Sequence, residues 1–152
     1  MATPTTTAQR VFDIAMGLMD EVNESTGNTD TSDTREYKVR TLFILNALRG
    51  ELFPYSDTFS VEEPGKRPIL AVIQTFTDVI GMDDFICQTV MPYGLAAHLL
   101  LDENPSAASF FMQRYEELRA QLAKGFSTVS EAIEDVYGGS MSHPYNDFAR
   151  WG

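Results

Sequence analysis

The chain has 152 residues, of which 43 % are apolar, and this is enough for one ordinary domain with a hydrophobic core. The formal net charge is −11 and only 11 residues are Lys or Arg. Because phosphate contacts need clustered basic side chains, this composition argues against nucleic-acid binding. No apolar run approaches the roughly 20 residues of a membrane span, and the first residues lack the pattern of a signal peptide. We therefore expect a soluble, intracellular protein with no membrane partner.

Two helices are predicted in the first third of the chain. Apolar residues at helical spacing indicate a first helix over about 6–22 and a second over about 34–52. The polar segment 24–33 between them is typical of a loop. Asp33, followed three residues later by Glu36, resembles a capping box at the start of the second helix.

The segment 55–81 has a different pattern. A turn is expected at the Pro- and Gly-containing residues 64–68, and residues 69–76 are rich in β-branched and apolar side chains. This pattern predicts a short β-hairpin or an extended arm. A helix over 69–80 is the alternative, because periodicity does not distinguish the two structures in a short apolar run.

Two further helices are predicted after the arm. The third covers about 83–101, with a kink near Pro92. The fourth covers 105–124, because Asn104 is a good N-cap and Pro105 fits the first helical position, where no N–H is needed.

One more short helix is predicted over 127–136, and it ends at the glycine pair 138–139. The expected fold is therefore mainly α. It is a four-helix bundle-like domain over residues 1–137 that includes the arm, followed by an extended C-terminal tail over 138–152.

The tail carries three aromatic residues at a regular interval of three, namely Tyr145, Phe148 and Trp151. A terminus that stays in water is usually polar, whereas each of these rings can remove roughly 150–250 Å² from water. The rings could fold back on the core of their own chain or dock on another subunit. The glycine pair and the proline that precede them favour docking, and aromatic residues are common anchors at interfaces.

The sequence offers little catalytic chemistry. A single cysteine, Cys87, excludes an intramolecular disulfide and is most simply a buried thiol. The two histidines, His98 and His143, have no spacing typical of a zinc site. The adjacent carboxylates of Asp83 and Asp84 are explained by the N-terminus of a helix. We therefore expect a protein that is not an enzyme and that has no metal and no cofactor.

A family resemblance rests on the second half of the chain. Its residues are the stretch 91–105 (MPYGLAAHLLLDENP), the pair Phe110-Phe111, the stretch 114–118 (RYEEL) and the ending 133–139 (IEDVYGG). This half resembles the head–tail connector (adaptor) proteins of tailed bacteriophages, of the kind found in siphophages and prophages of Gram-positive hosts. The first two helices fit that family by pattern only.

The resemblance implies a structural head-completion protein of the virion neck, present in the host cytoplasm during assembly. Such a protein forms a homo-oligomeric ring, a dodecamer by family resemblance, below the portal protein. The ring extends the DNA channel and connects the head to a head-closure or tail-completion protein. Family members grip the portal or a neighbouring subunit with an extended terminal segment, so the resemblance implies that Tyr145, Phe148 and Trp151 are docking anchors.

Composition adds two sets of candidate residues to this picture. Apolar side chains of the arm are candidates for subunit contacts: Phe59, Val61, Ile69 and Val72. Acidic side chains are candidates for the channel wall, where they would repel DNA as a transiting polyanion: Glu62, Glu63, Asp83 and Asp84.

Two other functions are compatible with the same sequence. One is a different neck component, such as a head-closure or tail-terminator protein, although these are richer in strand. The other is a small helical regulator that binds a host protein through the aromatic tail.

Overall fold

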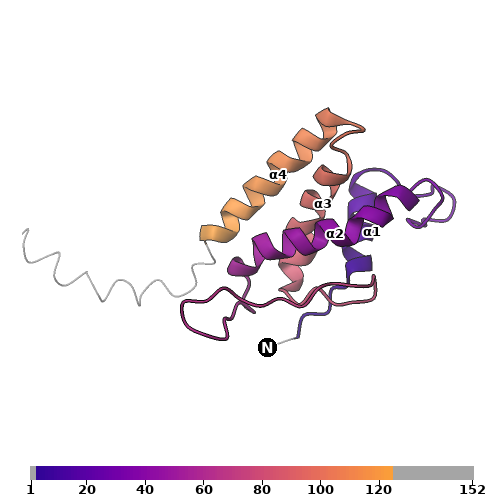
Figure 1. The fold of residues 1–152 in the computed structure, drawn as a ribbon. Helices are drawn as coiled ribbons and strands as arrows, with labels where there is room; N and C mark the ends of the chain where they lie inside the picture. Colours follow the sequence, from indigo (N-terminus) through magenta and orange to yellow (C-terminus); the bar gives the residue numbers. More distant parts are fainter. Residues whose placement is uncertain (1–2, 125–152) are drawn as a thin grey trace, which may run out of the picture.

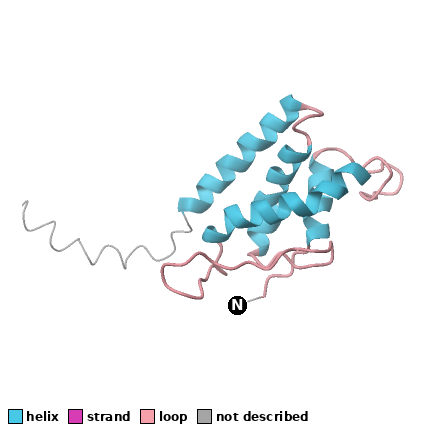
Figure 2. Cartoon of the chain, in the orientation of Figure 1, coloured by secondary structure: helices cyan, strands magenta, loops and turns pink. Residues whose placement is uncertain are grey.

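The structure is a computed structural model that describes residues 3–124, and in this range the fold is mainly α, with no strand (Figure 2). The predicted helix over 127–136 and the tail lie outside the described residues. The helical elements are α1 (Ala8–Leu18), α2 (Arg35–Leu52), the 3₁₀ turn η1 (Phe53–Tyr55), the π-helical turn η2 (Ile86–Val90), α3 (Met91–Leu99) and α4 (Pro105–Lys124). Figure 1 shows α3 in the middle of the molecule, between α4 and the α1–α2 pair.

The core is built around α3, which packs against α1, α2 and α4. Met91, Leu95 and Leu99 of α3 are essentially inaccessible to solvent. They meet side chains of α1 and α2 that recur at helical spacing, such as Phe12 and Leu48. The predicted main helices are therefore confirmed, and their apolar stripes converge on α3.

Helix α1 is capped by Thr7 and ends earlier than predicted. The hydroxyl of Thr7 accepts a hydrogen bond from the backbone N–H of Arg10, at 3.2 Å. The helix stops at Leu18 instead of continuing to residue 22, because Asp20 adopts a φ of 61°. This left-handed conformation reverses the chain direction and ends the helix.

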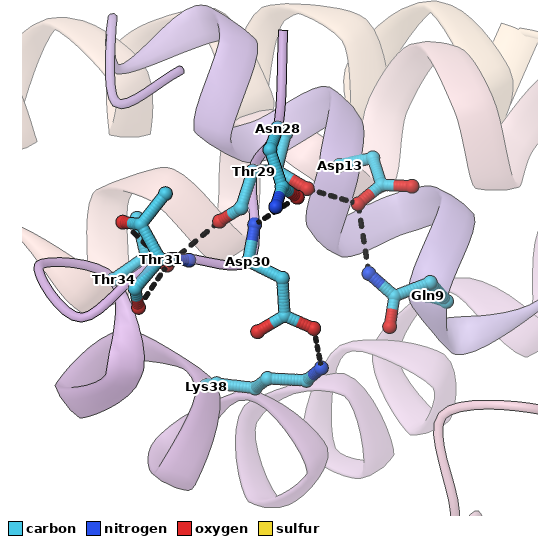
Figure 3. A network of polar contacts seen from close by, with 8 residues as sticks. All are labelled: Gln9, Asp13, Asn28, Thr29, Asp30, Thr31, Thr34 and Lys38. Atoms are coloured by element: carbon cyan, nitrogen blue, oxygen red, sulfur yellow. Dashed lines mark hydrogen bonds and ion pairs between the residues drawn. The ribbon is translucent and has the colours of Figure 1, made fainter. Parts of the chain in front are cut away.

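The loop between α1 and α2 is fastened by side-chain hydrogen bonds rather than by apolar packing (Figure 3). The carboxylate of Asp13 accepts from the hydroxyl of Thr29, at 2.6 Å, and from the amide of Gln9, at 2.8 Å. Asp30 pairs with Lys38 of α2. These bonds hold the loop against both helices, which explains how so polar a segment is ordered.

The predicted capping box at the start of α2 is wrong. The N-cap residue is Thr34, not Asp33, and its side chain does not cap the helix. Instead, the Thr34 hydroxyl donates a hydrogen bond to the backbone carbonyl of Thr29, at 2.7 Å. The buried threonine therefore stabilises the loop before the helix.

The helical segment before α3 contains the expected irregularity near Pro92. The chain becomes helical at Asp84, widens into the π turn η2, and continues as α3. Pro92 has no N–H to donate to the carbonyl of Gln88, four residues earlier, and its ring would collide with that carbonyl in a regular helix. A wider turn at this point makes room for the ring.

Helices α3 and α4 form a tight antiparallel hairpin. Asn104 caps α4 as predicted, because its side-chain oxygen accepts from the backbone N–H of Ala107 at 3.2 Å. The two helices approach closely at Gly94. A Cβ atom on this residue would lie 2.9 Å from the ring of Tyr115 and 3.0 Å from Leu48 of α2. Glycine is therefore needed at the point where α3, α4 and α2 meet.

Candidate assembly surfaces

The arm is an extended chain that lies along α2. Asn46 of α2 binds Ile73 of the arm twice, because its side-chain oxygen accepts from the backbone N–H of Ile73 at 2.8 Å and its amide donates to the Ile73 carbonyl at 3.1 Å. Arg49, one turn further on, donates to the carbonyl of Ala71. The side chains of α2 thus supply the backbone hydrogen bonds that a neighbouring strand would supply in a sheet.

Of the two predictions for the arm, the structure has the extended chain, and the alternative helix over 69–80 is wrong. No hairpin forms within residues 3–124, where the only β-type pairing is an isolated bridge between Thr7 and Val79. Figure 1 shows the arm passing below α2 and reaching the N-terminal end of α1. A helix would have withdrawn the backbone groups of residues 71 and 73 from Arg49 and Asn46.

The far end of the arm is bound to the start of α1. The backbone N–H groups of Ala8 and Gln9 donate to the carbonyls of Asp78 and Phe76, at 3.0 and 2.9 Å. The first N–H groups of a helix have no partner inside it, so the arm satisfies donors that would otherwise need water. The arm is therefore part of the body, although it has no regular structure of its own.

Arg49 is buried beneath the arm. Only 8 % of its surface is exposed, and burial lowers the pKa of its guanidinium. Among residues 3–124 it has no carboxylate partner, so its bond to the Ala71 carbonyl is its link to the arm. Burying a cation without a counter-charge costs free energy, and a hydrogen bond to the buried group offsets part of that cost. The bond from Arg49 to the Ala71 carbonyl therefore ties the arm to α2.

The four predicted arm residues for subunit contacts are all exposed to solvent. Ile69 and Val72 are the most exposed, at 76 % and 66 %. Phe59 and Val61 are less exposed, and the Phe59 ring packs against Phe53 with ring centroids 5.4 Å apart. Ile69 and Val72 are therefore the arm side chains that have the most apolar surface left to bury.

Sequence reasoning missed two apolar residues on the outer side of α2. Phe43 is 80 % exposed, and Val39 precedes it by one helical turn on the same side. Asn46, one turn beyond Phe43, binds the arm residue that directly follows Val72. We use the name α2–arm surface for Val39, Phe43, Ile69 and Val72. The available signal was that residues 39 and 43 are apolar but lie off the buried stripe of α2.

The predicted acidic residues fall into two groups. Glu62 and Glu63 are exposed in the turn of the arm. Asp83 and Asp84 are half-buried, and both accept hydrogen bonds from distant parts of the chain. Asp83 accepts from the backbone N–H of Asp57 at 3.1 Å. A channel-facing role for these four carboxylates stays a prediction.

Asp84 holds the N-terminal segment of the chain. Its carboxylate accepts from the backbone N–H groups of Thr5 and Thr6, both at 2.9 Å, and from the Thr6 hydroxyl at 2.6 Å. These donors favour the ionised carboxylate and lower the pKa of Asp84, with the Thr6 hydroxyl contributing most. The aspartate pair therefore fixes two loops at the start of the helical segment that leads into α3.

A groove of about 750 Å³ lies between the end of α3 and the length of α4. Its apolar lining comes from Ala97, Leu101, Ala108, Met112 and Ala120, and its polar lining from Ser109, Gln113, Glu116 and Glu117. Of the apolar lining, Leu101 and Ala120 are exposed to water, Met112 is half-buried, and Ala97 and Ala108 are buried. We call this feature the α3–α4 groove.

Residues that could carry chemistry are separated in the structure. Cys87 is buried, as expected, and burial raises the pKa of its thiol to about 12. His98 is exposed on α3. Within residues 3–124, no three His, Cys, Asp or Glu side chains lie together in a way that could hold a metal ion. No helix in the same range has the length and apolar character needed to cross a membrane.

The predicted tail anchors Tyr145, Phe148 and Trp151, and the second histidine, His143, lie outside the described residues. Comparison of the chain with protein-family models, with curated proteins and with solved structures finds no match.

Proposed function

We propose that this chain is a structural assembly protein without catalytic activity. Specifically, we propose a head–tail adaptor of a tailed bacteriophage, which forms a ring below the portal protein and connects it to a head-closure or tail-completion protein. The proposal rests on the resemblance of residues 91–118 to such adaptors and on the apolar α2–arm surface.

The exposure of Phe43 is the observation that carries this proposal. Apolar surface in water costs about 25 cal/mol per Å², and soluble monomers seldom gather large exposed apolar side chains on one side. Val39 on the same helix, and Ile69 and Val72 on the adjoining arm, are further exposed apolar side chains. A neighbouring subunit that covers this surface would remove the cost.

The rigid attachment of the arm also supports an assembly role. An interface is tighter when its parts are already ordered before binding, because less conformational entropy is lost. Asn46 and Arg49 hold the arm in place, so Ile69 and Val72 are presented to a partner in one arrangement. The acidic turn with Glu62 and Glu63 would suit the wall of a DNA channel in such a ring.

Electron microscopy of the purified full-length chain tests the proposal, alone and with the portal protein of the same phage. We expect rings in the wild type. In the variant Phe43→Ser, which removes an exposed ring and leaves the core intact, we expect the rings to be lost and the melting temperature to be unchanged.

The matched control is Phe110→Ser, which removes an exposed ring of α4 that lines neither the α2–arm surface nor the α3–α4 groove. Rings are expected to persist in this control. If the wild type forms no rings in either mixture, or Phe43→Ser forms them normally, the proposal is wrong.

The tail has its own test within this proposal. Deletion of residues 138–152 is expected to leave the helical circular dichroism spectrum intact and to prevent incorporation into particles. A truncated chain that is incorporated normally would refute the docking role of Tyr145, Phe148 and Trp151.

A further inference from the structure

We propose that the α3–α4 groove is the binding site for the aromatic tail, residues 138–152, of a neighbouring copy of this chain. This inference rests on the proposed ring and identifies the surface that receives the tail. The groove and the tail are different parts of the chain, so the contact between copies is heterologous. Heterologous contacts close into a ring when the rotation between copies allows it.

The shape and lining of the groove suit aromatic side chains. Ala120 has a short exposed side chain, which leaves room for an inserted ring beside the exposed Leu101, whereas Ala97 and Ala108 are buried. Met112 adds a polarizable thioether, which makes favourable contacts with aromatic rings. At about 750 Å³ the groove lies within the ~300–1,000 Å³ typical of ligand pockets.

The segment 138–152 carries one acidic and one basic side chain, Asp147 and Arg150, and only Arg150 can pair with the acidic rim of the groove. Arg150, between Phe148 and Trp151, is the only Lys or Arg among residues 125–152. The rim of the groove carries the carboxylates of Glu116 and Glu117. Glu117 pairs with Arg114 at 3.4 Å, whereas the carboxylate of Glu116 forms no ion pair within residues 3–124. Glu116 is therefore the natural partner for Arg150.

The chain has the reach to place its tail on a neighbour. The part beyond the described residues continues from Lys124, the last residue of α4, and Ala120 of the groove lies one turn before that point. Residues 125–143 precede the aromatic segment and can span about 45 Å with the predicted helix over 127–136 and the rest extended. This exceeds the length of α4 itself, which is about 30 Å for its 20 residues.

The only tryptophan of the chain, Trp151, gives a direct measurement of the contact. The receptor is the full-length variant with alanine at positions 145, 148 and 151, which contains no tryptophan. The probe is a synthetic peptide of residues 138–152. We expect the tryptophan emission of the peptide to shift to shorter wavelength on titration with the receptor, because the indole leaves water.

Variants of the receptor test whether the groove is the site. Leu101→Glu and Ser109→Glu change exposed groove positions and should weaken binding at least about tenfold, as expected for the centre of an interface. Phe110→Glu is the control, because this neighbour of Ser109 is exposed but does not line the groove. Equal weakening by all three variants, or by none, would overturn the inference.

A charge exchange tests the proposed ion pair. Glu116→Lys in the receptor should weaken binding of the natural peptide about two- to fivefold, the range of an exposed pair. A peptide with Arg150→Glu should regain that loss only on the receptor that carries Glu116→Lys. If the exchanged pair shows no recovery, Arg150 does not face Glu116 and this part of the inference fails.

Dilution of the wild-type chain distinguishes a neighbour's tail from the chain's own. Docking between copies requires the Trp151 emission to shift to longer wavelength as the chain is diluted, whereas an emission that does not change with concentration would overturn docking between copies. Rings that form although the peptide does not bind would refute this inference and leave the adaptor proposal standing. Peptide binding in a chain that never forms rings would refute the adaptor proposal alone.

Discussion

The α3–α4 hairpin and the arm both pack beside α2, but different interactions hold them. The hairpin is held by close apolar contact, with Gly94 against the Tyr115 ring and Leu48. The arm buries Ile73 and Ile80 in the core as well, but its backbone is held by polar side chains of α2, because Asn46 and Arg49 bond to it. A helix satisfies its own backbone and needs only an apolar face to pack, whereas an extended chain without a sheet must find its hydrogen-bond partners elsewhere.

The largest effect is expected from a substitution that disrupts the packing of the α3–α4 hairpin. In Gly94→Ala, the new methyl group would lie 2.9 Å from the Tyr115 ring, a distance at which something must shift. We expect a loss of about 2–3 kcal/mol in the free energy of unfolding, because overpacking outweighs the better helix propensity of alanine. Urea denaturation measures this loss.

The same substitution at Gly50 of α2 is the matched control. A Cβ atom there has no neighbour within 4 Å in the described structure. Gly50→Ala should therefore stabilise the chain by up to about 1 kcal/mol, through helix propensity alone. Stabilisation by Gly94→Ala as well would show that contact at Gly94 does not position the hairpin.

The next effect concerns the arm. Asn46→Ala removes both hydrogen bonds to Ile73 and leaves the part-buried backbone N–H of Ile73 without its partner. We expect a loss of about 1–2 kcal/mol in the free energy of unfolding. Amide hydrogen exchange should become faster at Ile73 and stay slow in α3. Slow exchange at Ile73 in the variant would mean that Asn46 does not hold the arm.

A smaller effect concerns pH and the N-terminal segment. Because the pKa of Asp84 is lower in the folded chain, its contribution to stability is present above the unfolded pKa of about 4 and is lost as pH falls through the folded pKa. Acid denaturation followed by circular dichroism should show a flatter decline in Asp84→Asn than in the wild type. Identical acid transitions would show that Thr5 and Thr6 do not stabilise the ionised carboxylate.

The smallest effect is expected at Cys87. Burial raises the pKa of this thiol to about 12, so almost none of it is thiolate at neutral pH. A thiol reagent should label the native chain only as fast as the chain opens, and Asn46→Ala should change this rate less than Gly94→Ala does. Rapid labelling of the native wild type would contradict the burial of Cys87 beneath the helices.

The contrast between hairpin and arm also decides what could be predicted from the sequence. The hairpin follows from local signals, because Asn104 and Pro105 mark the start of α4 and the apolar spacing marks its buried face. The arm follows from residues of another helix, Asn46 and Arg49, whose spacing within α2 gives no indication of the segment they bind. The helix over 69–80 was therefore a reasonable alternative that only tertiary contacts exclude.

The residues of the α2–arm surface also differ in how far the sequence indicates them. The composition of the arm indicates Ile69 and Val72 as subunit contacts; both are exposed, and their role in subunit contacts stays a prediction. The contribution of Val39 and Phe43 was not expected, because a stripe of buried residues on one side of α2 drew attention away from apolar residues on the other. Which partner covers these side chains depends on a second chain, and no pattern within one sequence identifies it.

The most direct test of the central claim, that a neighbouring copy covers the α2–arm surface, is hydroxyl-radical labelling of Phe43 in the full-length chain before and after assembly. We predict that labelling of Phe43 falls on assembly while labelling of Phe110, which is also exposed, stays constant. Equal labelling of Phe43 in free and assembled protein would contradict the claim.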